Sequence, residues 1–485
     1  MSRSGRTQRS WRRWGQHAVS KGVTTTSVML LVAAAATSVG AQGSDPEFDH
    51  AKEFRQSMGF EAGDAYLRES LAHPERFPSD AWGVPLTNAE TNELYRRSRM
   101  VLDASDTVAE AGRMDGFAGV YMDHDRDGRL VFQFSKGVQA AEQAIAASMP
   151  SDVDFGVRKV DYSLEELDAV GEDLLSRADS LLDQDIQLVS LRYDIQDNRV
   201  VAAVDGSPSS AERVFEDVSG AFVVEAGEAA VLDACNDVTD CRPAKGGIRI
   251  NDGKFCTAAV VGKRTDGTAH RVLITAGHCL QGNADGTWKH KGEVVGTDEA
   301  RIWQQSSNQP YPTIPADIGI IDLDDGFRPA SDSNNKFIFT NGGTVYRFGD
   351  LVNPPTDTPV CTIGAGSEDI GWPAKRCGKI EAYYIVRLTC QNAGTDPPCA
   401  WVEISVSVDF DSTGGDSGAP YWIDPGSSPY TLIGIHTHSH EDGDGPYHTG
   451  KEGWYVSMTR SLHYLSQKSP PVIVHACIDG NCSAP

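Results

Sequence analysis

The sequence predicts two folded regions of different character: an α+β region over residues 42–234, and an all-β region that begins at residue 235. All ten cysteines lie between Cys235 and Cys482, so the first region has none. The charge changes at the same place, because residues 42–234 carry a net charge of -22 and residues 235–485 a net charge of -9. A chain of 485 residues also exceeds the usual size of one hydrophobic core, which favours more than one domain.

The composition argues against several classes of protein. Hydrophobic residues make up 40% of the chain and charged residues 23%, close to the globular average, which excludes a wholly disordered or fibrous protein. The net charge of -25 argues against a nucleic-acid-binding protein, because phosphate contacts need clustered lysine and arginine.

Residues 1–41 have the pattern of a signal peptide. Six basic residues and no acidic ones accompany the apolar run 28–36, which is much shorter than the roughly 20 residues that span a membrane. Small residues at 39–41 favour cleavage before Gln42. We therefore expect a secreted protein without membrane attachment once the signal is removed. In an exported chain, ten cysteines indicate five disulfides.

The α+β region predicts a repeated unit. Thr87 and Ser163 each begin a capping box, which marks the start of a helix. Between these helices and after them, the same order of hairpin, helix and strand occurs twice. In the first copy we expect strands at 117–122 and 129–134, a helix at 138–149 and a strand at 155–160. In the second copy we expect strands at 188–193 and 200–204, a helix from Ser209 and a strand at 221–224. A helix at 163–182 lies between the two copies.

The turn of the first hairpin also resembles the start of a calcium loop. Asp123, Asp125 and Asp127 have the right spacing, but the twelfth loop position is Phe134 instead of glutamate, and the flanks are typical of strands. A hairpin turn is therefore the favoured interpretation, and no catalytic cluster is expected in this region.

The first region resembles the pro-segments of secreted bacterial peptidases of the streptogrisin and alpha-lytic type. The stretches that carry the resemblance are 117–121 (FAGVY), 160–164 (VDYSL) and 198–201 (NRVV). The resemblance implies that residues 42–234 assist folding of the domain that follows and are then removed. An ordinary binding domain, retained on the mature protein, is the alternative.

Three short motifs in the second region bring together a nucleophile, a base and a carboxylate. His278 ends residues 273–278 (LITAGH), Asp317 precedes the apolar run 318–321, and Ser417 lies in the glycine-rich turn 414–418 (GGDSG). Such a set activates an otherwise unreactive hydroxyl. The order and separations resemble the chymotrypsin-like serine peptidases over most of residues 242–465.

That resemblance implies two antiparallel β-barrels, with His278 and Asp317 in the first and Ser417 in the second. Ser417 would be the nucleophile, His278 the general base and acid, and Asp317 the group that orients His278. The backbone N–H groups of Gly415 and Ser417 would form the oxyanion hole. The reaction needs no cofactor, and the substrates would be polypeptides. Residues 235–465 would be the peptidase domain and residues 466–485 a tail with a small cysteine loop.

The family pattern also implies a disulfide between Cys256 and Cys279. The remaining cysteines pair most economically with near neighbours, although spacing alone does not fix connectivity. The expected pairs are Cys235–Cys241, Cys361–Cys377, Cys390–Cys399 and Cys477–Cys482. No cysteine lies near Ser417 in the sequence, so the disulfide that often braces this pocket is missing.

Two features disagree about the substrate pocket, which we expect to include Asp411, His436, Thr437 and Ser439. Asp411 lies six residues before Ser417, the spacing of the carboxylate that selects arginine and lysine in trypsin-like enzymes. Residues 434–437 (GIHT) instead resemble the strand of bacterial glutamyl endopeptidases, in which this histidine meets an acidic side chain. We favour acidic selectivity, glutamate before aspartate. A direct pairing of His436 with Asp411 and a neutral pocket is the third option.

Other classes fit less well. An α/β-hydrolase would have its acid and histidine after the serine. His436, His438 and His440 alternate along a strand and could bind zinc, but the rest of a metallopeptidase site is missing, so no metal is expected. A catalytically impaired binding protein of the same fold is the remaining alternative, although all three members of the triad are present.

Overall fold

The computed structural model describes most of the chain between residues 46 and 482. The residues outside its description are 1–45, 80–81, 185, 219, 228–229, 233–246, 248, 252–254, 265–270, 282–285, 291, 304–312, 324–345, 349–353, 367–374, 391–398, 404, 411, 414, 427–429, 440–448, 451–452, 469–470, 479–480 and 483–485. The predicted signal peptide and its cleavage before Gln42 lie outside the described residues. None of the helices in the described part is long and apolar enough to cross a membrane.

Four helices precede the first sheet: α1 (Pro46–Ser57), α2 (Asp64–Ala72), α3 (Asn88–Asp103) and α4 (Ser105–Ala111). The capping box at Thr87 is confirmed, because the Thr87 hydroxyl accepts from the Glu90 N–H and the Glu90 carboxylate accepts from the Thr87 N–H. Buried side chains of α1 and α3, among them Phe54 and Leu94, pack in the same core as the first sheet of the all-β region.

The predicted repeat is confirmed. The first copy consists of β1 (Phe117–Asp123), β2 (Arg129–Phe134), α5 (Val138–Ser148) and β3 (Phe155–Lys159); the second of β4 (Gln187–Asp194), β5 (Arg199–Asp205), α8 (Pro208–Val214) and β6 (Phe222–Ala226). In both copies the hairpin is antiparallel and the last strand returns parallel to the second. Asp127, with φ of 56°, and the glycine after it make the first hairpin turn.

The connecting helix begins at the second predicted capping box, where Ser163 and Glu166 bond reciprocally. It is divided into α6 (Leu164–Ser176) and α7 (Ala178–Leu182). The division lies at Arg177, whose side chain turns away to pair with Asp173 and Asp217.

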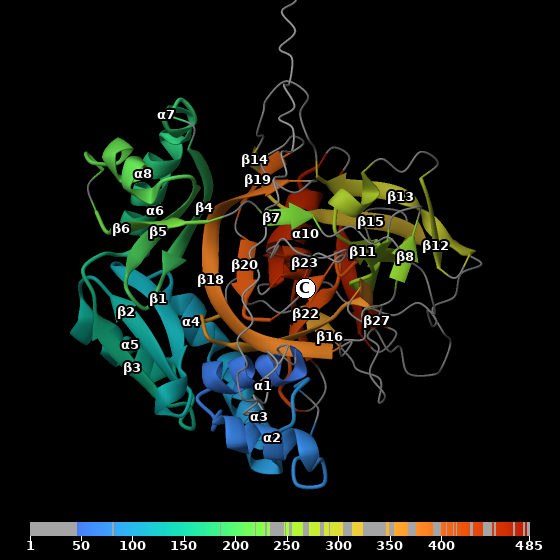
Figure 1. The fold of residues 1–485 in the computed structure, drawn as a ribbon, viewed down its shortest axis with the longest axis horizontal. Helices are drawn as coiled ribbons and strands as arrows, with labels where there is room; N and C mark the ends of the chain where they lie inside the picture. The colour runs from blue at the N-terminus through green and yellow to red at the C-terminus, as the bar shows by residue number, and fades with distance from the viewer. Residues whose placement is uncertain are drawn as a thin grey trace, which may run out of the picture. The chain divides into compact units, whose positions relative to one another are not determined.

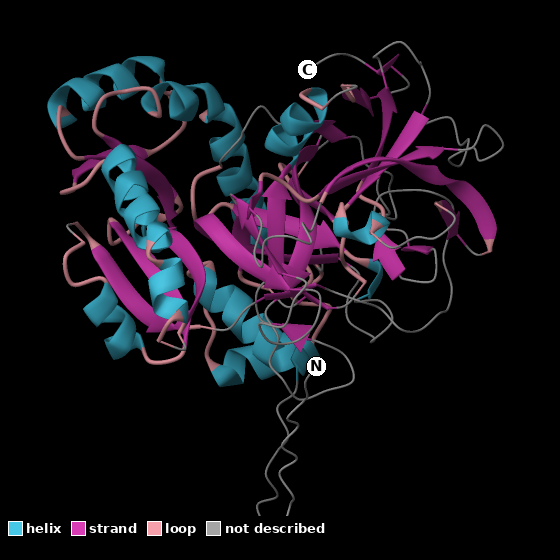
Figure 2. Cartoon of the chain, turned by 90° about the horizontal axis from the view of Figure 1, so that it is seen from above, coloured by secondary structure: helices cyan, strands magenta, loops and turns pink. Residues whose placement is uncertain are grey.

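The all-β region is confirmed as two large, mainly antiparallel sheets, in agreement with the two expected barrels (Figures 1 and 2). In the described part, the first sheet has the order β27-β26-β10-β11-β15-β13-β12-β8-β9. Its strands are β8 (Arg249–Asn251), β9 (Phe255–Thr257), β10 (Val260–Arg264), β11 (Arg271–Thr275), β12 (Thr287–His290), β13 (Glu293–Ile302), β15 (Ile318–Leu323), β26 (Val474–Ile478) and β27 (Asn481–Cys482).

The main path of the second sheet is β17-β22-β23-β25-β20-β18-β4-β5-β6, again in the described part. Its strands from the all-β region are β17 (Pro359–Ile363), β18 (Lys375–Cys390), β20 (Ser405–Val408), β22 (Pro420–Ile423), β23 (Tyr430–Ser439) and β25 (Gly453–Ser457). Four shorter strands pair beside this path: β7 (Ala230–Leu232), β14 (Thr313–Ile314), β16 (Tyr346–Phe348) and β19 (Cys399–Glu403). The strands β21 (Ser412–Thr413) and β24 (Thr449–Gly450) form a separate small sheet, and α10 (Met458–Ser466) follows β25.

The second repeat joins this sheet directly. Figure 1 shows β18 as a long curved strand beside β4, and the two are antiparallel with Leu191 opposite Val386 and Arg192 opposite Tyr384. Because the sheet continues across the predicted domain boundary, residues Asp45–Pro485 form one compact unit. The boundary at residues 234 and 235 stays a prediction.

The expected C-terminal tail is partly built into the first sheet. β26 pairs with β10, and Val472 and Val474 are buried in the core of that sheet. Cys477 lies opposite Cys482 in the hairpin that β26 makes with β27. The sequence predicted that residues 466–485 lie outside the peptidase domain. In the structure, the apolar residues of this segment pack against the edge of β10.

Candidate functional site

His278 and Asp317 come from neighbouring strands of the first sheet. His278 begins a short 3-10 turn (His278–Leu280) after β11, and Asp317 immediately precedes β15, which pairs with β11. The chain packs too tightly here for a side chain at residue 277, since a Cβ on Gly277 would lie 2.5 Å from the carbonyl oxygen of Ile302. The glycine therefore permits the approach that places the histidine against the aspartate.

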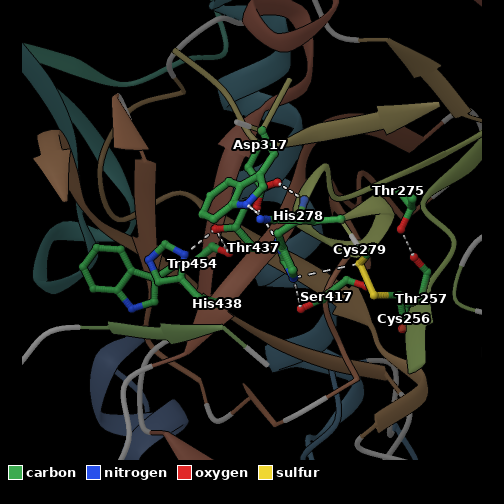
Figure 3. A network of polar contacts seen from close by, with 12 residues as sticks. Cys256, Thr257, Thr275, His278, Cys279, Asp317, Ser417, Thr437, His438 and Trp454 are labelled. Atoms are coloured by element: carbon green, nitrogen blue, oxygen red, sulfur yellow. Dashed lines mark hydrogen bonds and ion pairs between the residues drawn. A yellow bond between two sulfur atoms is a disulfide. The ribbon is translucent and has the colours of Figure 1, made fainter. Parts of the chain in front are cut away.

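The structure brings His278, Asp317 and Ser417 into one hydrogen-bonded line (Figure 3). The His278 Nδ1 lies 2.7 Å from Asp317 Oδ2, and the His278 Nε2 lies 2.9 Å from Ser417 Oγ. The backbone N–H of His278 donates to the other carboxylate oxygen of Asp317, at 2.8 Å. The carboxylate thus determines both where the ring lies and which of its nitrogens carries the proton.

All three side chains are shielded from water. Asp317 and Ser417 have no exposed surface, and 7% of His278 is exposed. The indole of Trp303 packs edge-on against the His278 ring, with 5.7 Å between the ring centroids. Low polarity around the line strengthens its hydrogen bonds.

The turn that carries Ser417 depends on two glycines and one threonine. Gly415 and Gly418 have φ values of 95° and 90°, which side chains other than glycine rarely adopt. Thr257 of β9 holds both sides of the serine: its hydroxyl donates to the Gly415 carbonyl at 2.6 Å, and its N–H donates to the Ser417 carbonyl at 2.6 Å. Thr275 in turn donates to the Thr257 carbonyl at 2.8 Å. The first sheet therefore fixes the serine of the second.

Asp416 takes no part in the hydrogen bonds that join Asp317, His278 and Ser417. It makes a structural contact instead. Its carboxylate accepts from the guanidinium of Arg376 at 2.6 Å, and both side chains are almost completely buried. Arg376 precedes Cys377, which is bonded to Cys361. The turn that lacks a cysteine of its own is thus braced by an ion pair next to a disulfide.

A second disulfide joins Cys256 to Cys279, the pairing that was expected. The Cys279 sulfur lies 3.9 Å from the Ser417 carbonyl oxygen, so this disulfide touches the serine turn from the other side. Cys256, His278 and Cys279 are the one group of metal-ligating type in the described part of the chain, and two of its members are consumed by the disulfide.

The other expected disulfides are seen only in part. The backbones of Cys390 and Cys399 lie opposite each other between β18 and β19, as those of Cys477 and Cys482 do between β26 and β27. Cys235 and Cys241 lie outside the described residues. These three pairings stay predictions.

His436 lies on β23 next to the serine turn. Its backbone N–H donates to the Ala419 carbonyl at 2.7 Å, and its carbonyl accepts from the Gly418 N–H at 2.8 Å. The His436 Nδ1 lies 2.9 Å from the hydroxyl of Tyr421, and the two rings are stacked with 3° between their planes. A tyrosine O–H that donates to Nδ1 would leave the imidazole proton on Nε2, where it can donate.

The remaining pocket residues differ in role. Thr437 is buried beside His436, and its hydroxyl lies 2.6 Å from the His438 Nδ1. The backbone of Ser439 ends β23. His440 and Asp411 lie outside the described residues, so the proposed Asp411 pocket and its pairing with His436 stay predictions.

His436 and His438, the two histidines of β23 in the described part, lie in different environments, although their alternation along the sequence predicted one shared face. The pairing of β23 with β25 shifts between His436 and His438. His438 stacks on Trp454, with 5.3 Å between the ring centroids, whereas His436 stacks on Tyr421. Burial holds the pKa of His438 well below its usual range, and the charge of Arg387 lowers it further, so His438 is a neutral core residue.

Sequence reasoning missed Thr257, Arg376 and Tyr421. No local pattern distinguishes them, because each acts on a residue far away in the chain. The sequence offered one hint for Thr257: it follows Cys256, and the expected partner of Cys256 is Cys279, the residue after His278. This pairing places Thr257 close to the site.

Comparisons with known proteins address the second region. Residues 237–461 match the family model described as Trypsin. Among solved structures, a glutamic-acid-specific serine protease with a histidine triad in substrate binding is 23% identical, over 46% of this chain and 97% of its own, with a TM-score of 0.32. A Nocardiopsis protease is 15% identical, over 45% of this chain and 95% of its own, with a TM-score of 0.30. A chymotrypsin of Cellulomonas bogoriensis is 18% identical, over 47% and 97%, with a TM-score of 0.28. No curated protein matches the chain.

Proposed function

Because residues 237–461 form a domain of the trypsin family, we propose that this chain is the precursor of a secreted serine endopeptidase that works through Ser417, His278 and Asp317. The observation that carries the proposal is the position of His278 between the Asp317 carboxylate and the Ser417 hydroxyl, at 2.7 and 2.9 Å. The distances are those that proton transfer between these groups requires.

The chemistry follows from the hydrogen bonds. Ser417 Oγ attacks the carbonyl carbon of the scissile bond while its proton moves to His278 Nε2. The imidazolium then formed is stabilised by Asp317, which keeps its negative charge. His278 next gives the proton to the leaving amine, and water releases the acyl group by the same steps in reverse.

The oxyanion hole would be formed by the backbone N–H groups of Gly415 and Ser417. The Gly415 and Ser417 carbonyls are both bonded to Thr257, which fixes the peptide plane after each of these residues and so limits how the turn can rearrange. Donors that are fixed in advance stabilise the developing charge without reorganisation.

The nucleophile is tested with Ser417→Ala, and Ser466→Ala serves as a control because Ser466 lies on α10 and bonds only within that helix. We expect Ser417→Ala to abolish peptide hydrolysis and labelling by a serine-directed phosphonate, since the nucleophile is lost. The control should retain both. Undiminished turnover by Ser417→Ala would end the serine-peptidase proposal, and a correctly folded native protein that is never labelled would favour the binding-protein alternative.

The proposal extends to acidic residues, glutamate before aspartate, on the N-terminal side of the cleaved bond. The support is His436: Tyr421 accounts for its Nδ1, which makes Nε2–H a donor suited to a carboxylate. Its backbone is bonded to the residue after Ser417, so it lies next to the reacting bond.

Cleavage mapping on a protein digest decides the selectivity. We expect cuts after Glu and Asp to dominate, and Tyr421→Phe to weaken that preference while cleavage chemistry is retained, because the ring stays and only the hydroxyl is lost. Cuts after Arg or Lys that disappear in Asp411→Ser would favour the trypsin-like alternative.

Residues 42–234 are proposed to act as a folding aid that is removed between about Val224 and Gly247. The support is the sheet shared by β4 and β18 and the core in which Leu191 and Val386 pack together. Refolding of residues 235–485 should be much faster with residues 42–234 added than without them. Equal rates would contradict the folding role.

A further inference from the structure

Side chains at the end of β13, and directly after it, hold the short turn on which His278 lies. The guanidinium of Arg301 donates to the Leu280 carbonyl. The indole N–H of Trp303 donates to the side-chain oxygen of Gln281, and the backbone N–H of Gln281 donates to the His278 carbonyl at 3.1 Å. Side chains therefore tie this turn to the first sheet at two points.

The indole of Trp303 connects this turn back to the imidazole of His278. The two rings pack edge-on, with 5.7 Å between their centroids and 68° between their planes. Only 2% of Trp303 is exposed, and its bond to Gln281 fixes the orientation of the indole against the histidine. By contrast, the indole N–H groups of the buried Trp82 and Trp454 have no hydrogen-bond partner in the described part of the chain. The tether thus sets Trp303 apart from these core tryptophans.

Three contacts hold the imidazole of His278 in the free chain. Figure 3 shows the ring between Asp317 and Ser417, 2.7 Å from the first at Nδ1 and 2.9 Å from the second at Nε2. The third contact is the edge-on packing of Trp303. A single hydrogen bond at Nδ1 tolerates tilting of the ring, because its strength falls steeply only when the bond is strongly bent. Ser417 and Trp303 are therefore the two contacts that keep Nε2 in place.

One of these two contacts is lost during the reaction. Once Ser417 is acylated, its proton has left with the amine, and the ester oxygen has no proton to share with Nε2 of His278. Water must then add its oxygen to the acyl carbon and give a proton to Nε2, which passes it to Ser417 Oγ as the ester bond breaks. Nε2 therefore has to stay in place at the stage when Ser417 no longer holds it.

From this geometry we propose that Trp303, tethered by Gln281, is a positioning residue that holds His278 in the acyl-enzyme and so acts mainly on deacylation. Acylation depends on it less, because the Ser417 hydroxyl itself aligns the ring in that step. The inference rests on the proposed serine-peptidase function, which it deepens by assigning a residue to one half of the reaction.

The experiment measures the two halves of the reaction separately in the secreted enzyme. With para-nitrophenyl acetate, the initial burst of nitrophenolate reports acylation and the steady rate that follows reports deacylation, each per active site titrated with the phosphonate. We expect Trp303→Leu to slow deacylation about tenfold and acylation no more than about twofold, since small misplacements of a catalytic group are costly. Trp303→Phe should recover part of the loss, because it keeps an aromatic ring.

Two further variants test the tether and the specificity of the effect. Gln281→Met keeps the volume but removes the acceptor of the indole N–H, so it should slow deacylation by less than Trp303→Leu and leave acylation nearly unchanged. Trp288→Phe is the matched control, because Trp288 is also buried in the first sheet and bonds through its indole N–H to Asp298. It should leave the ratio of the two rates as in the wild type.

The outcomes separate this inference from the proposed function. Equal slowing of both steps in Trp303→Leu, or unchanged rates with fewer active sites, would show a merely structural role and overturn the inference. If Trp303→Leu yields no active sites, Trp303→Phe and Gln281→Met decide by the same ratio. A wild type with neither a burst nor labelling of Ser417 would refute the serine-peptidase function and this inference with it. A wild type that shows both keeps its function whatever the ratio in the variants.

Discussion

The two repeats of the first region have the same order of elements but attach to the all-β region in different ways. The second repeat is attached by backbone pairing, because β4 continues the sheet through β18. The first repeat closes a three-stranded sheet of its own. In the described part of the chain, its contacts with the all-β region run through side chains and one bridge between Tyr121 and Thr356. The same arrangement of hairpin, helix and strand can therefore either extend a neighbouring sheet or pack against it through side chains. The second repeat extends the sheet because an edge of β4 pairs with β18.

The side-chain contacts of the first repeat include a cluster of charged groups. A ring nitrogen of His124 lies 2.7 Å from the Asp357 carbonyl oxygen, and the Asp357 carboxylate is paired with Lys379. Asp409 accepts from the backbone N–H of Lys379. The Asp357 carboxylate also accepts from the Gln196 side chain in the turn between β4 and β5, at 2.9 Å, so the cluster touches both repeats, whereas the backbone ladder between β4 and β18 contains no titratable group.

The largest effect is expected from a proline in β4. Arg192→Pro removes a ladder bond from a strand that has partners on both sides, which should cost about 3 kcal/mol or more. At about 1.4 kcal/mol per factor of ten, this is a loss of roughly a hundredfold in the folding equilibrium constant, and we expect the yield of active enzyme to fall with it. Yield is measured by titrating Ser417 with the phosphonate.

Two control variants show whether the effect of Arg192→Pro comes from the lost backbone hydrogen bond. Arg192→Ala should keep most of the yield, since its ion pair with Glu225 is partly exposed and such pairs contribute little. Lys159→Pro, on the outer strand β3 of the first repeat, should also be tolerated. The N–H of the next residue, Val160, donates to the Phe134 carbonyl of β2, and N–H groups alternate along a strand. The Lys159 N–H therefore points away from β2, and proline removes no bond between the two strands. Equal losses in Arg192→Ala and Arg192→Pro would mean that the strand pairing is unimportant.

A smaller effect is expected from Lys379→Met, which leaves the buried Asp357 and the half-buried Asp409 without their cation. The free energy of unfolding should fall by about 2 kcal/mol, because an uncompensated charge remains buried. Denaturant unfolding of the full-length Ser417→Ala chain measures it, and the exposed Lys159→Met provides the baseline. No difference between the two lysine variants would refute the cluster's contribution.

The third expected effect is a pH dependence of the free energy of unfolding. Burial raises the pKa of Asp409 to about 7, although Lys379 opposes the shift. A raised pKa means that the folded chain binds this proton more tightly than the unfolded chain. The contribution of Asp409 to stability is therefore complete below about pH 4 and is lost as the pH rises through about 7, by about 1 kcal/mol per pH unit.

Asp409→Asn isolates this contribution, because the amide resembles the protonated carboxyl. Compared with this variant, the chain with Asp409 should become less stable as the pH rises from 5 to 7. Burial and the charge of Arg97 lower the pKa of His124 to about 3, so His124 makes the free energy of unfolding rise with pH. This contribution is the same in the chain with Asp409 and in the Asp409→Asn variant, so it cancels in their difference. Parallel stability curves would show that Asp409 is not titrating in this range.

The sequence by itself determined the local elements and the chemical residues of this protein. Capping boxes at Thr87 and Ser163, and the Asp127 turn, depend on atoms within a few residues of each other, so their patterns predicted the helices and the hairpin correctly. The motifs around His278, Asp317 and Ser417 were also visible, because the side chains needed for the reaction stand in short strings that resemble a known family.

Only the tertiary structure decided which distant segments meet. The pairing of β4 with β18, the place of β26 beside β10, and the two bonds from Thr257 to the Ser417 turn join residues that are far apart in the chain. The same holds for Tyr421, whose hydroxyl lies 2.9 Å from the His436 Nδ1 on the neighbouring strand. Backbone donors and acceptors are the same at every residue, so no local sequence specifies the partner of a strand edge; the packing of the whole chain selects it.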